Sequence, residues 1–182
     1  MAFPVVAMPD SVRVHKALLD SLGVKKLQAA AGASGGSIPE MEWAALHPGL
    51  GERVVHVIRP GFDIHPYVIQ LLPVWASPIM LDARRNKGDY CGRDEPVDGV
   101  AVALMNATVT ARSFGWAERT FGYKWADPAT NPGDEMGNAF AIQDTLAKAG
   151  AARARATDAN SLIYMAKAKT GSTGSPTTRS MG

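Results

Sequence analysis

Apolar side chains recur at helical spacing along most of the chain and predict a largely helical fold. The best-defined pattern runs from Val97 to about Phe114, with its apolar residues largely on one face and Asp98 where an anion stabilises the helix dipole. Helix stop signals and capping residues define further segments. The predicted helices cover residues 10–22, 37–46, 67–81, 97–114, 134–154 and, with a weaker pattern, 158–169.

One of these helices is supported by its capping residues, and another is interrupted by prolines. Ser37 and Glu40 have the spacing of a capping box, and Pro39 suits a first helical turn. Residues 67–81 form the most apolar stretch, but Pro73 and Pro78 cannot donate helical hydrogen bonds. We therefore expect either one kinked helix or two short ones there, and we expect it in the core.

Evidence for β-structure is limited to residues 53–58, RVVHVI, which are β-branched and short enough for a strand. No second convincing strand accompanies them, so the pattern predicts no sheet. Residues 29–37, AAAGASGGS, are predicted to be a flexible connector. The expected fold class is mainly α, a single helical core domain at residues 37–155. An N-terminal arm with one helix and the Gly-rich connector (1–36) and a C-terminal arm (156–182) would flank it.

Composition limits the architecture to one ordinary core. The chain has 182 residues, of which 46% are hydrophobic and 20% charged, so two independent domains are not expected. The single Cys91 excludes an intramolecular disulfide and a multi-cysteine zinc site. The chain starts MAFPVVAMPD and has no apolar run of the roughly 18 to 20 residues that span a bilayer. These features predict a soluble, intracellular protein.

The net charge of +2 is unevenly distributed. After Phe140 there are six basic and two acidic residues, which gives +4, whereas the other 13 basic and 15 acidic residues give −2. This asymmetry indicates an electrostatic interaction through the C-terminal segment, although a solvated helix face has the same composition.

One possible catalytic motif is present. Gly32, Ser34 and Gly36 match the G-x-S-x-G pattern of a nucleophile elbow, and three histidines follow. The elbow requires a strand before the serine and a helix after it. Because an Ala-rich helical segment is expected before Ser34, the sequence predicts no nucleophile there. The glycines lack the Gly-Lys-Ser/Thr ending of a P-loop, and no histidine pair has metal-ligand spacing, so we expect neither cofactor nor catalysis.

Cations and aromatic residues form the strongest functional pattern. Arg84, Arg85 and Lys87 directly follow the apolar segment, and Arg112, Arg119 and Lys124 alternate with aromatic rings over residues 112–125. Cations hold phosphates and rings stack on bases, so this pattern favours binding of single-stranded RNA without sequence specificity. The structural alternative is that rings such as Phe114 and Phe121 are core anchors.

These segments resemble the coat proteins of flexible filamentous plant RNA viruses, of the potexvirus and potyvirus type. The resemblance rests on LDARRNKGDYCGR, ARSFGWAE, FGYKWADPATNPGDEM, NAFAIQDTLAKAGAARA, SIPEMEWAAL and GSTGSPT, and covers roughly Ser37 to Pro176. VIRPGFDI and LDARRN also resemble the rigid-rod coat of the tobacco mosaic type, a tobamovirus-like alternative.

The resemblance implies a viral capsid protein of the virion and host cytoplasm that polymerises helically around RNA through its terminal arms. In that family a Ser, an Arg and an Asp hold the RNA, and Asp127 would orient a cation; otherwise it begins the turn before Pro128. The alternatives are a non-polymerising single-stranded nucleic-acid-binding protein and a small hydrolase using Ser34. The expected RNA-binding residues are Arg59, Arg84, Arg85, Lys87, Arg112, Ser113, Arg119, Lys124 and Asp127.

Overall fold

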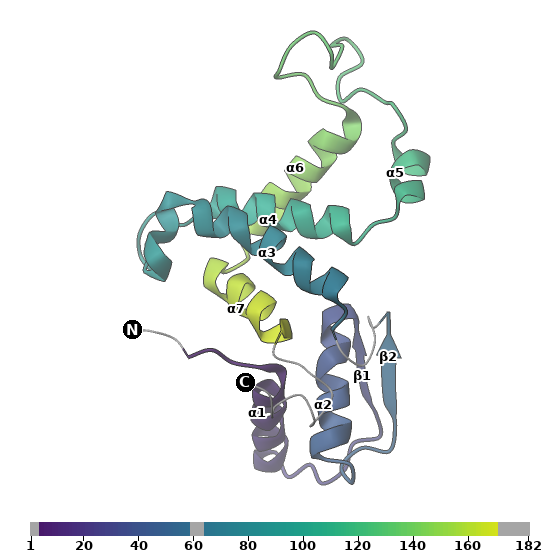
Figure 1. Cartoon of the computed structure of the whole chain (residues 1–182), viewed down its shortest axis with the longest axis vertical. Coiled ribbons are helices and arrows are strands. Elements are labelled where there is room, and N and C mark those ends of the chain that lie inside the picture. The colour runs from purple at the N-terminus through teal and green to yellow at the C-terminus, as the bar shows by residue number, and fades with distance from the viewer. Residues whose placement is uncertain (1–3, 59–63, 171–182) are drawn as a thin grey trace. The chain divides into compact units, whose positions relative to one another are not determined.

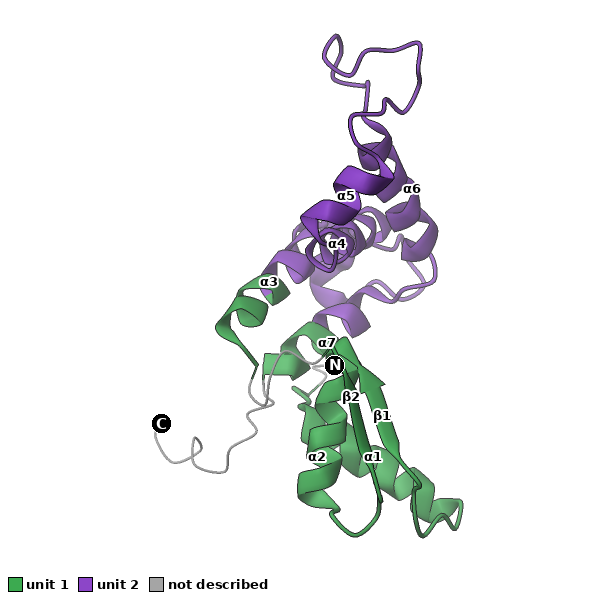
Figure 2. Cartoon of the chain, turned by 90° about the vertical axis from the view of Figure 1, so that its right-hand side faces the viewer, with its two compact units in different colours: residues 1–72, 164–182 green, residues 73–163 purple. Residues whose placement is uncertain are grey.

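The computed structural model describes residues 4–58 and 64–170 of the chain (Figure 1). It forms two compact units, residues 1–72 with 164–182, and residues 73–163 (Figure 2). The elements in chain order are α1 (Met8–Ser21), β1 (Ala30–Ala33), η1 (Ser34–Ser37), α2 (Ile38–Leu46), β2 (Val54–Val57), α3 (Pro66–Leu81), η2 (Ala83–Gly88), α4 (Val97–Thr110), α5 (Phe114–Thr120), α6 (Ala141–Ala154) and α7 (Ala159–Thr170).

The first unit is built around a parallel β-α-β arrangement. Strands β1 and β2 pair in parallel, with Ala30 opposite Val54 and Gly32 opposite His56. Helix α2 connects the two strands and packs against both, and α1 packs against α2. Parallel strands need such a crossover, because a tight turn can join only antiparallel neighbours. A small apolar cluster holds the unit together and comprises Met8, Ile38, Ala168 and the partly buried Ile64.

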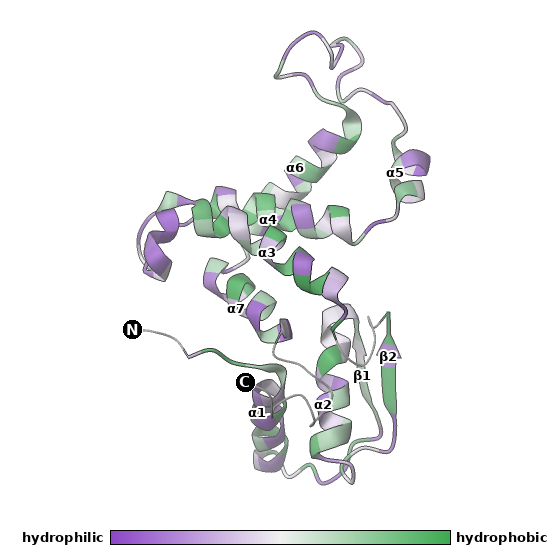
Figure 3. Ribbon diagram, viewed as in Figure 1, coloured by the Kyte–Doolittle hydropathy of each residue, from purple (hydrophilic) through white to green (hydrophobic). Residues whose placement is uncertain are grey.

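This arrangement contradicts the prediction of a mainly α fold. Residues 54–57 form the expected strand, but the statement that they have no sheet to join is wrong, since they pair with β1. The predicted flexible connector, residues 29–37, contains β1 and the η1 turn. β1 consists only of alanine and glycine, which lack the β-branched side chains by which a strand is recognised in sequence. Figure 3 shows the contrast between the weakly coloured β1 and the largely hydrophobic β2.

The second unit is helical and centres on the packing of α4 against α6. A Cβ atom on Gly150 of α6 would lie 2.7 Å from the carbonyl oxygen of Ala101, so a glycine lets the two helix backbones approach closely. The predicted helix at 97–114 is confirmed, with Asp98 in its first turn, although it ends at Thr110. The core of this unit comprises Ile79, Tyr90, Val100, Ala103, Leu104, Ala154 and Ala159.

Two other helices decide between or correct earlier expectations. α3 is one helix that contains both Pro73 and Pro78, so the alternative of two short helices is wrong. α6 begins at Ala141 and not at the expected residue 134, because Gln143 caps it by accepting a hydrogen bond from the Phe140 N–H at 2.8 Å. The proposed division into arms at 1–36 and 156–182 and a core at 37–155 stays a prediction.

A buried tyrosine links the start of α7 to the core of the second unit. Tyr90 is only 4% exposed, and its hydroxyl donates a hydrogen bond to the Asp158 carboxylate. The same hydroxyl accepts the Asn160 N–H at 2.9 Å, and the Asn160 side chain donates to the Gly88 carbonyl at 2.9 Å. Burial, followed by the bond to Asp158, raises the pKa of Tyr90 to about 12. Burial and the bond to Asp158 therefore favour the neutral tyrosine, against the opposing effect of the Asn160 N–H.

Candidate active site at the strand-to-helix turn

Ser34 occupies a sharp turn between a strand and a helix in the first unit. Ala33 at the end of β1 is extended, with φ −120° and ψ 143°, whereas Ser34 has a φ of 52°. Positive φ is uncommon for a residue with a side chain, and such strain concentrates at functional sites. The chain then continues through η1 into α2, and Ser34 itself is exposed. The turn therefore presents a serine hydroxyl to the solvent.

Close packing on the strand side explains the first glycine of the motif. A Cβ atom on Gly32 would lie 2.2 Å from the Gly36 carbonyl oxygen and 2.3 Å from Glu40 Oε1. These distances are below any real contact, so residue 32 must be glycine if the turn is to close. On the helix side, the fully buried Ser37 donates a hydrogen bond from its hydroxyl to the Ser34 carbonyl oxygen. The close packing at Gly32 and the hydrogen bond from Ser37 both hold the backbone of residue 34.

The structure meets the condition that a nucleophile elbow requires. β1 precedes Ser34, which begins the η1 turn, and α2 follows, so Gly32, Ser34 and Gly36 lie in the strand-turn-helix context of G-x-S-x-G. The sequence prediction that Ser34 is not a nucleophile rested on an expected helix before it, and that helix is absent because residues 30–33 are a strand. The sequence did contain a signal for this site. The G-x-S-x-G motif is followed by an apolar helix and then by the β-branched run at residues 54–57, which is the order of a β-α-β arrangement.

Two charged side chains lie against this turn. Lys169 packs on Gly35, since a Cβ atom there would be 2.8 Å from Lys169 Cε and 2.9 Å from its Nζ. Desolvation lowers the pKa of the Lys169 amine from its ordinary value. Glu40 is 8% exposed, and its Oε2 has no hydrogen-bond partner among the described residues.

In an elbow, the N–H of the residue after the serine, here Gly35, is placed to stabilise an oxyanion.

The histidines are distributed around this unit. His56 lies on β2 opposite Gly32, and its Nδ1 is buried without a described partner. His47 packs against Trp43, with ring centroids 5.2 Å apart. Within the described part of the chain, no histidine is hydrogen-bonded to the Ser34 hydroxyl, and no cluster of His, Cys, Asp and Glu has the arrangement of a metal site.

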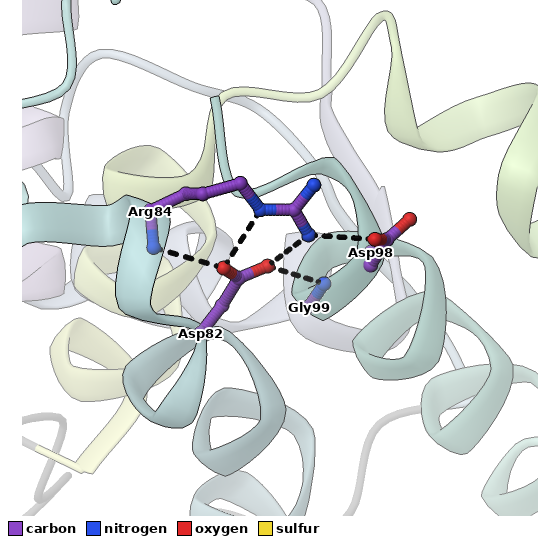
Figure 4. A network of polar contacts seen from close by, with 4 residues as sticks. All are labelled: Asp82, Arg84, Asp98 and Gly99. Carbon is purple, nitrogen blue, oxygen red and sulfur yellow. Dashed lines mark hydrogen bonds and ion pairs between the residues drawn. The ribbon is translucent and has the colours of Figure 1, made fainter. Parts of the chain in front are cut away.

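Arg84, one of the expected RNA-binding cations, is bonded to carboxylates of the protein itself (Figure 4). Arg84 donates from Nε to Asp82 Oδ1 at 3.0 Å and from Nη2 to Asp98 Oδ2 at 2.7 Å. Asp82 also accepts the N–H of Gly99 at 3.1 Å, which caps the first turn of α4. The bond from Arg84, together with two backbone N–H groups, lowers the pKa of Asp82 to about 2. The Arg84 charge is thus paired with two carboxylates.

The neighbouring cations have different environments. Arg85 is partly buried, and its Nε has no partner among the described residues. Lys87 is exposed and has a φ of 56° inside η2. Arg59 lies outside the described residues.

The residues expected to form an aromatic and cationic surface serve mainly local contacts. Arg112 lies over the Trp116 ring at 5.1 Å, and Ser113 caps α5 by accepting the Trp116 N–H at 3.3 Å. Arg119 lies against Gly115, and Lys124 is exposed. Phe114 is 85% exposed, so it is not the core anchor that the alternative interpretation assumed.

Asp127 belongs to a turn. Its Oδ1 accepts the N–H of Ala129 at 2.9 Å, and its carbonyl accepts the N–H of Thr130 at 3.1 Å. This is an Asx turn across Pro128, which is the structural alternative considered for this residue.

None of the described helices has the length and apolarity needed to cross a membrane.

The chain is similar to acyltransferases and esterases. It is 32% identical over 167 residues to a homoserine O-acetyltransferase of Methanosphaerula palustris, covering 92% of this chain and 34% of that protein. It is 35% identical to a serine O-succinyltransferase of Emericella nidulans, covering 91% of this chain and 32% of that one. No protein-family profile matches it. Among solved structures, esterase E22 is 36% identical with a TM-score of 0.81, over 92% of this chain and 46% of the esterase.

These similarities overturn the interpretation as a viral coat protein. The structural neighbours are esterases and acyltransferases of the α/β-hydrolase fold, not mainly α coat proteins of flexible or rigid-rod type. The relatives are enzymes of cellular organisms, so the predictions of a non-enzyme, a virion location, an RNA partner and a filament are wrong. The alternative of a non-polymerising nucleic-acid-binding protein does not fit either. The chain spans about a third to less than half of the length of the relatives it matches.

Proposed function

We propose that this chain carries the nucleophile of an acyl-transfer enzyme and that Ser34 is that nucleophile. The observation that carries the proposal is the φ of 52° at Ser34, between β1 and α2 and within G-x-S-x-G. A serine in this conformation projects its hydroxyl away from the backbone of the strand and of the helix, so a carbonyl carbon can approach it. The names of the relatives indicate acetyl or succinyl groups and the hydroxyl of serine or homoserine as acceptor.

The reaction proceeds in two steps. The Ser34 hydroxyl oxygen attacks the carbonyl carbon of the acyl donor, its proton passes to a general base, and the bond to the leaving group breaks as that group takes up a proton. The acceptor hydroxyl then attacks the acyl group, and Ser34 regains its proton. The Gly35 N–H lies next to the nucleophile and stabilises the negative charge on the carbonyl oxygen in both steps.

The experiment that tests this proposal is acylation of the full chain by p-nitrophenyl acetate. We expect release of p-nitrophenol together with one acetyl group on the peptide that contains Ser34, identified by mass spectrometry. Ser34→Ala should abolish both signals. Ser21→Ala, an exposed serine at the end of α1, should retain them. Acetylation elsewhere, or none on Ser34, would overturn the proposal.

A second candidate is simple ester hydrolysis, which the similarity to esterase E22 favours. The two functions differ only in the group that takes the acyl chain from Ser34, namely water or an alcohol. Addition of L-homoserine or L-serine to the assay separates them, because a transferase forms the O-acylated amino acid whereas an esterase forms only the free acid.

A further inference from the structure

Glu40 is a nearly buried carboxylate that touches the turn of the proposed nucleophile, and the reaction described above does not use it. It lies in the first turn of α2 and is 8% exposed. Its Oε1 would be 2.3 Å from a Cβ atom on Gly32, so the carboxylate occupies the space into which a side chain of residue 32 would project. Its Oε2 is buried and has no hydrogen-bond partner among the described residues.

Glu40 does not cap its own helix. Ser37 and Glu40 have the spacing of a capping box, in which the glutamate would accept the N–H of the N-cap residue. In the structure, α2 has no side-chain hydrogen bond at its N-cap, Ser37. The Ser37 hydroxyl is bonded instead to the Ser34 carbonyl oxygen, and the Glu40 carboxylate lies against Gly32. Both side chains of the expected capping box are therefore directed toward the turn that carries Ser34.

The Glu40 carboxylate lies where the two arms of this turn meet. A Cβ atom on Gly32 would be 2.2 Å from the Gly36 carbonyl oxygen and 2.3 Å from Glu40 Oε1, so both oxygens are next to the same point of the strand. Gly32 precedes Ser34 by two residues, and Gly36 follows it by two. A side chain packed into this space restricts the movement of β1 relative to η1, and with it the backbone conformation of Ser34.

The unpaired Oε2 indicates that Glu40 serves a purpose other than stability. Burial removes water from a carboxylate, and without a compensating hydrogen bond this costs free energy. We propose that Glu40 is a positioning residue, which holds the Ser34 turn by filling the space beside Gly32, and that the length of its side chain and not its charge has this effect. The inference rests on the proposed function of Ser34, and it involves no contact between Glu40 and the substrate.

Two variants separate the length of the side chain from its charge. Glu40→Gln keeps the length and removes the charge, whereas Glu40→Asp keeps the charge and shortens the side chain by one methylene. With p-nitrophenyl acetate, we expect Glu40→Gln to retain kcat within about twofold and Glu40→Asp to lower it about tenfold. KM should change by less than about twofold in both, because a misplaced nucleophile slows the chemical step more than it weakens binding. Glu118→Gln and Glu118→Asp, at an exposed glutamate of α5, are the matched controls.

Amide hydrogen exchange gives a readout that does not depend on activity. The peptide that covers residues 30–37 should exchange faster in Glu40→Asp than in Glu40→Gln, whereas a peptide from α4 should exchange equally in both. Glu40→Ala provides a second shortened variant if Glu40→Asp does not fold.

The possible outcomes separate this inference from the proposed function. If the unaltered protein is not acylated at Ser34 but the difference in exchange is present, the function proposed for Ser34 fails and the positioning of the turn by Glu40 stands. If Ser34 is acylated and Glu40→Asp keeps the kcat of the unaltered protein, only the role of Glu40 fails. An equal loss of kcat in Glu40→Gln would also overturn it, since that result assigns the effect to the charge. Equal exchange of residues 30–37 in the two variants would contradict the proposed restraint.

Discussion

The Ser37 hydroxyl donates a hydrogen bond to the carbonyl oxygen of Ser34, across the turn that carries the proposed nucleophile. Ser37 is fully buried, so its removal leaves the Ser34 carbonyl without that donor. We expect Ser37→Ala to lower the free energy of unfolding by about 1–2 kcal/mol and to slow acylation of Ser34, because the turn is less firmly held. Urea denaturation and the p-nitrophenyl acetate assay measure the two effects.

The matched control is Ser21→Ala. Ser21 makes the same kind of bond to the carbonyl three residues earlier, at 2.7 Å to Leu18, but it is exposed. Its removal should change the free energy of unfolding by less than about 0.5 kcal/mol. Equal losses in the two variants would show that the Ser37 bond has no special role at the turn.

The two glycines of the G-x-S-x-G motif should respond differently to alanine. A Cβ atom on Gly32 would overlap the Gly36 carbonyl oxygen at 2.2 Å, whereas one on Gly36 meets nothing within 4 Å. We therefore expect Gly32→Ala to lower the free energy of unfolding by about 2–3 kcal/mol and Gly36→Ala to change it by less than about 0.5 kcal/mol. Thermal or urea denaturation would check both. A destabilised Gly36→Ala together with an unaffected Gly32→Ala would contradict this structure of the turn.

The sequence predicts the helical unit better than the site. α4 combines a long apolar period with an acidic residue, Asp98, in its first turn, and both signals are local. The strand that precedes Ser34 has neither signal. Residues Ala30–Ala33 are small, and their partner strand β2 begins at Val54, so their conformation depends on a pairing across the intervening helix. Local pattern reading cannot detect such a pairing, and it therefore assigned the segment to a helix and a connector.

The cationic residues show that the partners of a charged side chain, like the pairing of β1, cannot be predicted from local sequence. Arg84 was expected to contact phosphate, but its guanidinium is paired with Asp82 two residues earlier and Asp98 fourteen residues later. A sequence gives the positions of the charges and not their partners. The motif at Ser34 was visible in the sequence, but its interpretation depended on whether a strand precedes it.

The Asp82 carboxylate should make a pH-dependent contribution to stability. It lies in the second unit, bonded to Arg84 and to the Gly99 N–H, and its pKa is lowered to about 2 from 3.8. A lowered carboxyl pKa stabilises the fold above pH 3.8, and this stabilisation is lost as the pH falls through about 2. At pH 7 we expect Asp82→Asn to lower the free energy of unfolding by roughly 2 kcal/mol, and we expect the difference from the unaltered protein to shrink between about pH 4 and pH 2.

Asp98→Asn removes the other carboxylate that is paired with the Arg84 guanidinium. The Asp98 side chain is 83% exposed, against 9% for Asp82, so solvent screens its bond to Arg84. Its substitution should change the free energy of unfolding by less than about 1 kcal/mol. Urea denaturation at several pH values measures both variants, and a pH-independent difference for Asp82→Asn would contradict the assigned ionisation.

Asp127→Asn should have little effect on the protein. Asparagine also accepts a hydrogen bond from the residue two positions on, so the turn through the Ala129 N–H is preserved without the charge. We expect a change of less than about 0.5 kcal/mol in the free energy of unfolding and unchanged acylation of Ser34. Asp127→Ala, which removes the acceptor as well, is the informative comparison. A large effect of Asp127→Asn alone would indicate that the charge has a partner beyond this turn.

The Tyr90 hydroxyl should stabilise the second unit in its neutral form. Replacement by phenylalanine leaves the Asn160 N–H without its acceptor and removes one donor from the Asp158 carboxylate, so we expect a loss of about 1–3 kcal/mol at pH 7. Tyr123→Phe, at a position that is 92% exposed, is the control and should be nearly neutral.

The pKa of Tyr90 is raised from 10.0 to about 12, so the contribution of its hydroxyl to stability is complete below pH 10 and is lost as the pH rises through 12. The difference in the free energy of unfolding between the unaltered protein and Tyr90→Phe should therefore narrow over this alkaline range. A difference that widened there would mean that the hydroxyl bonds favour the phenolate and not the neutral tyrosine.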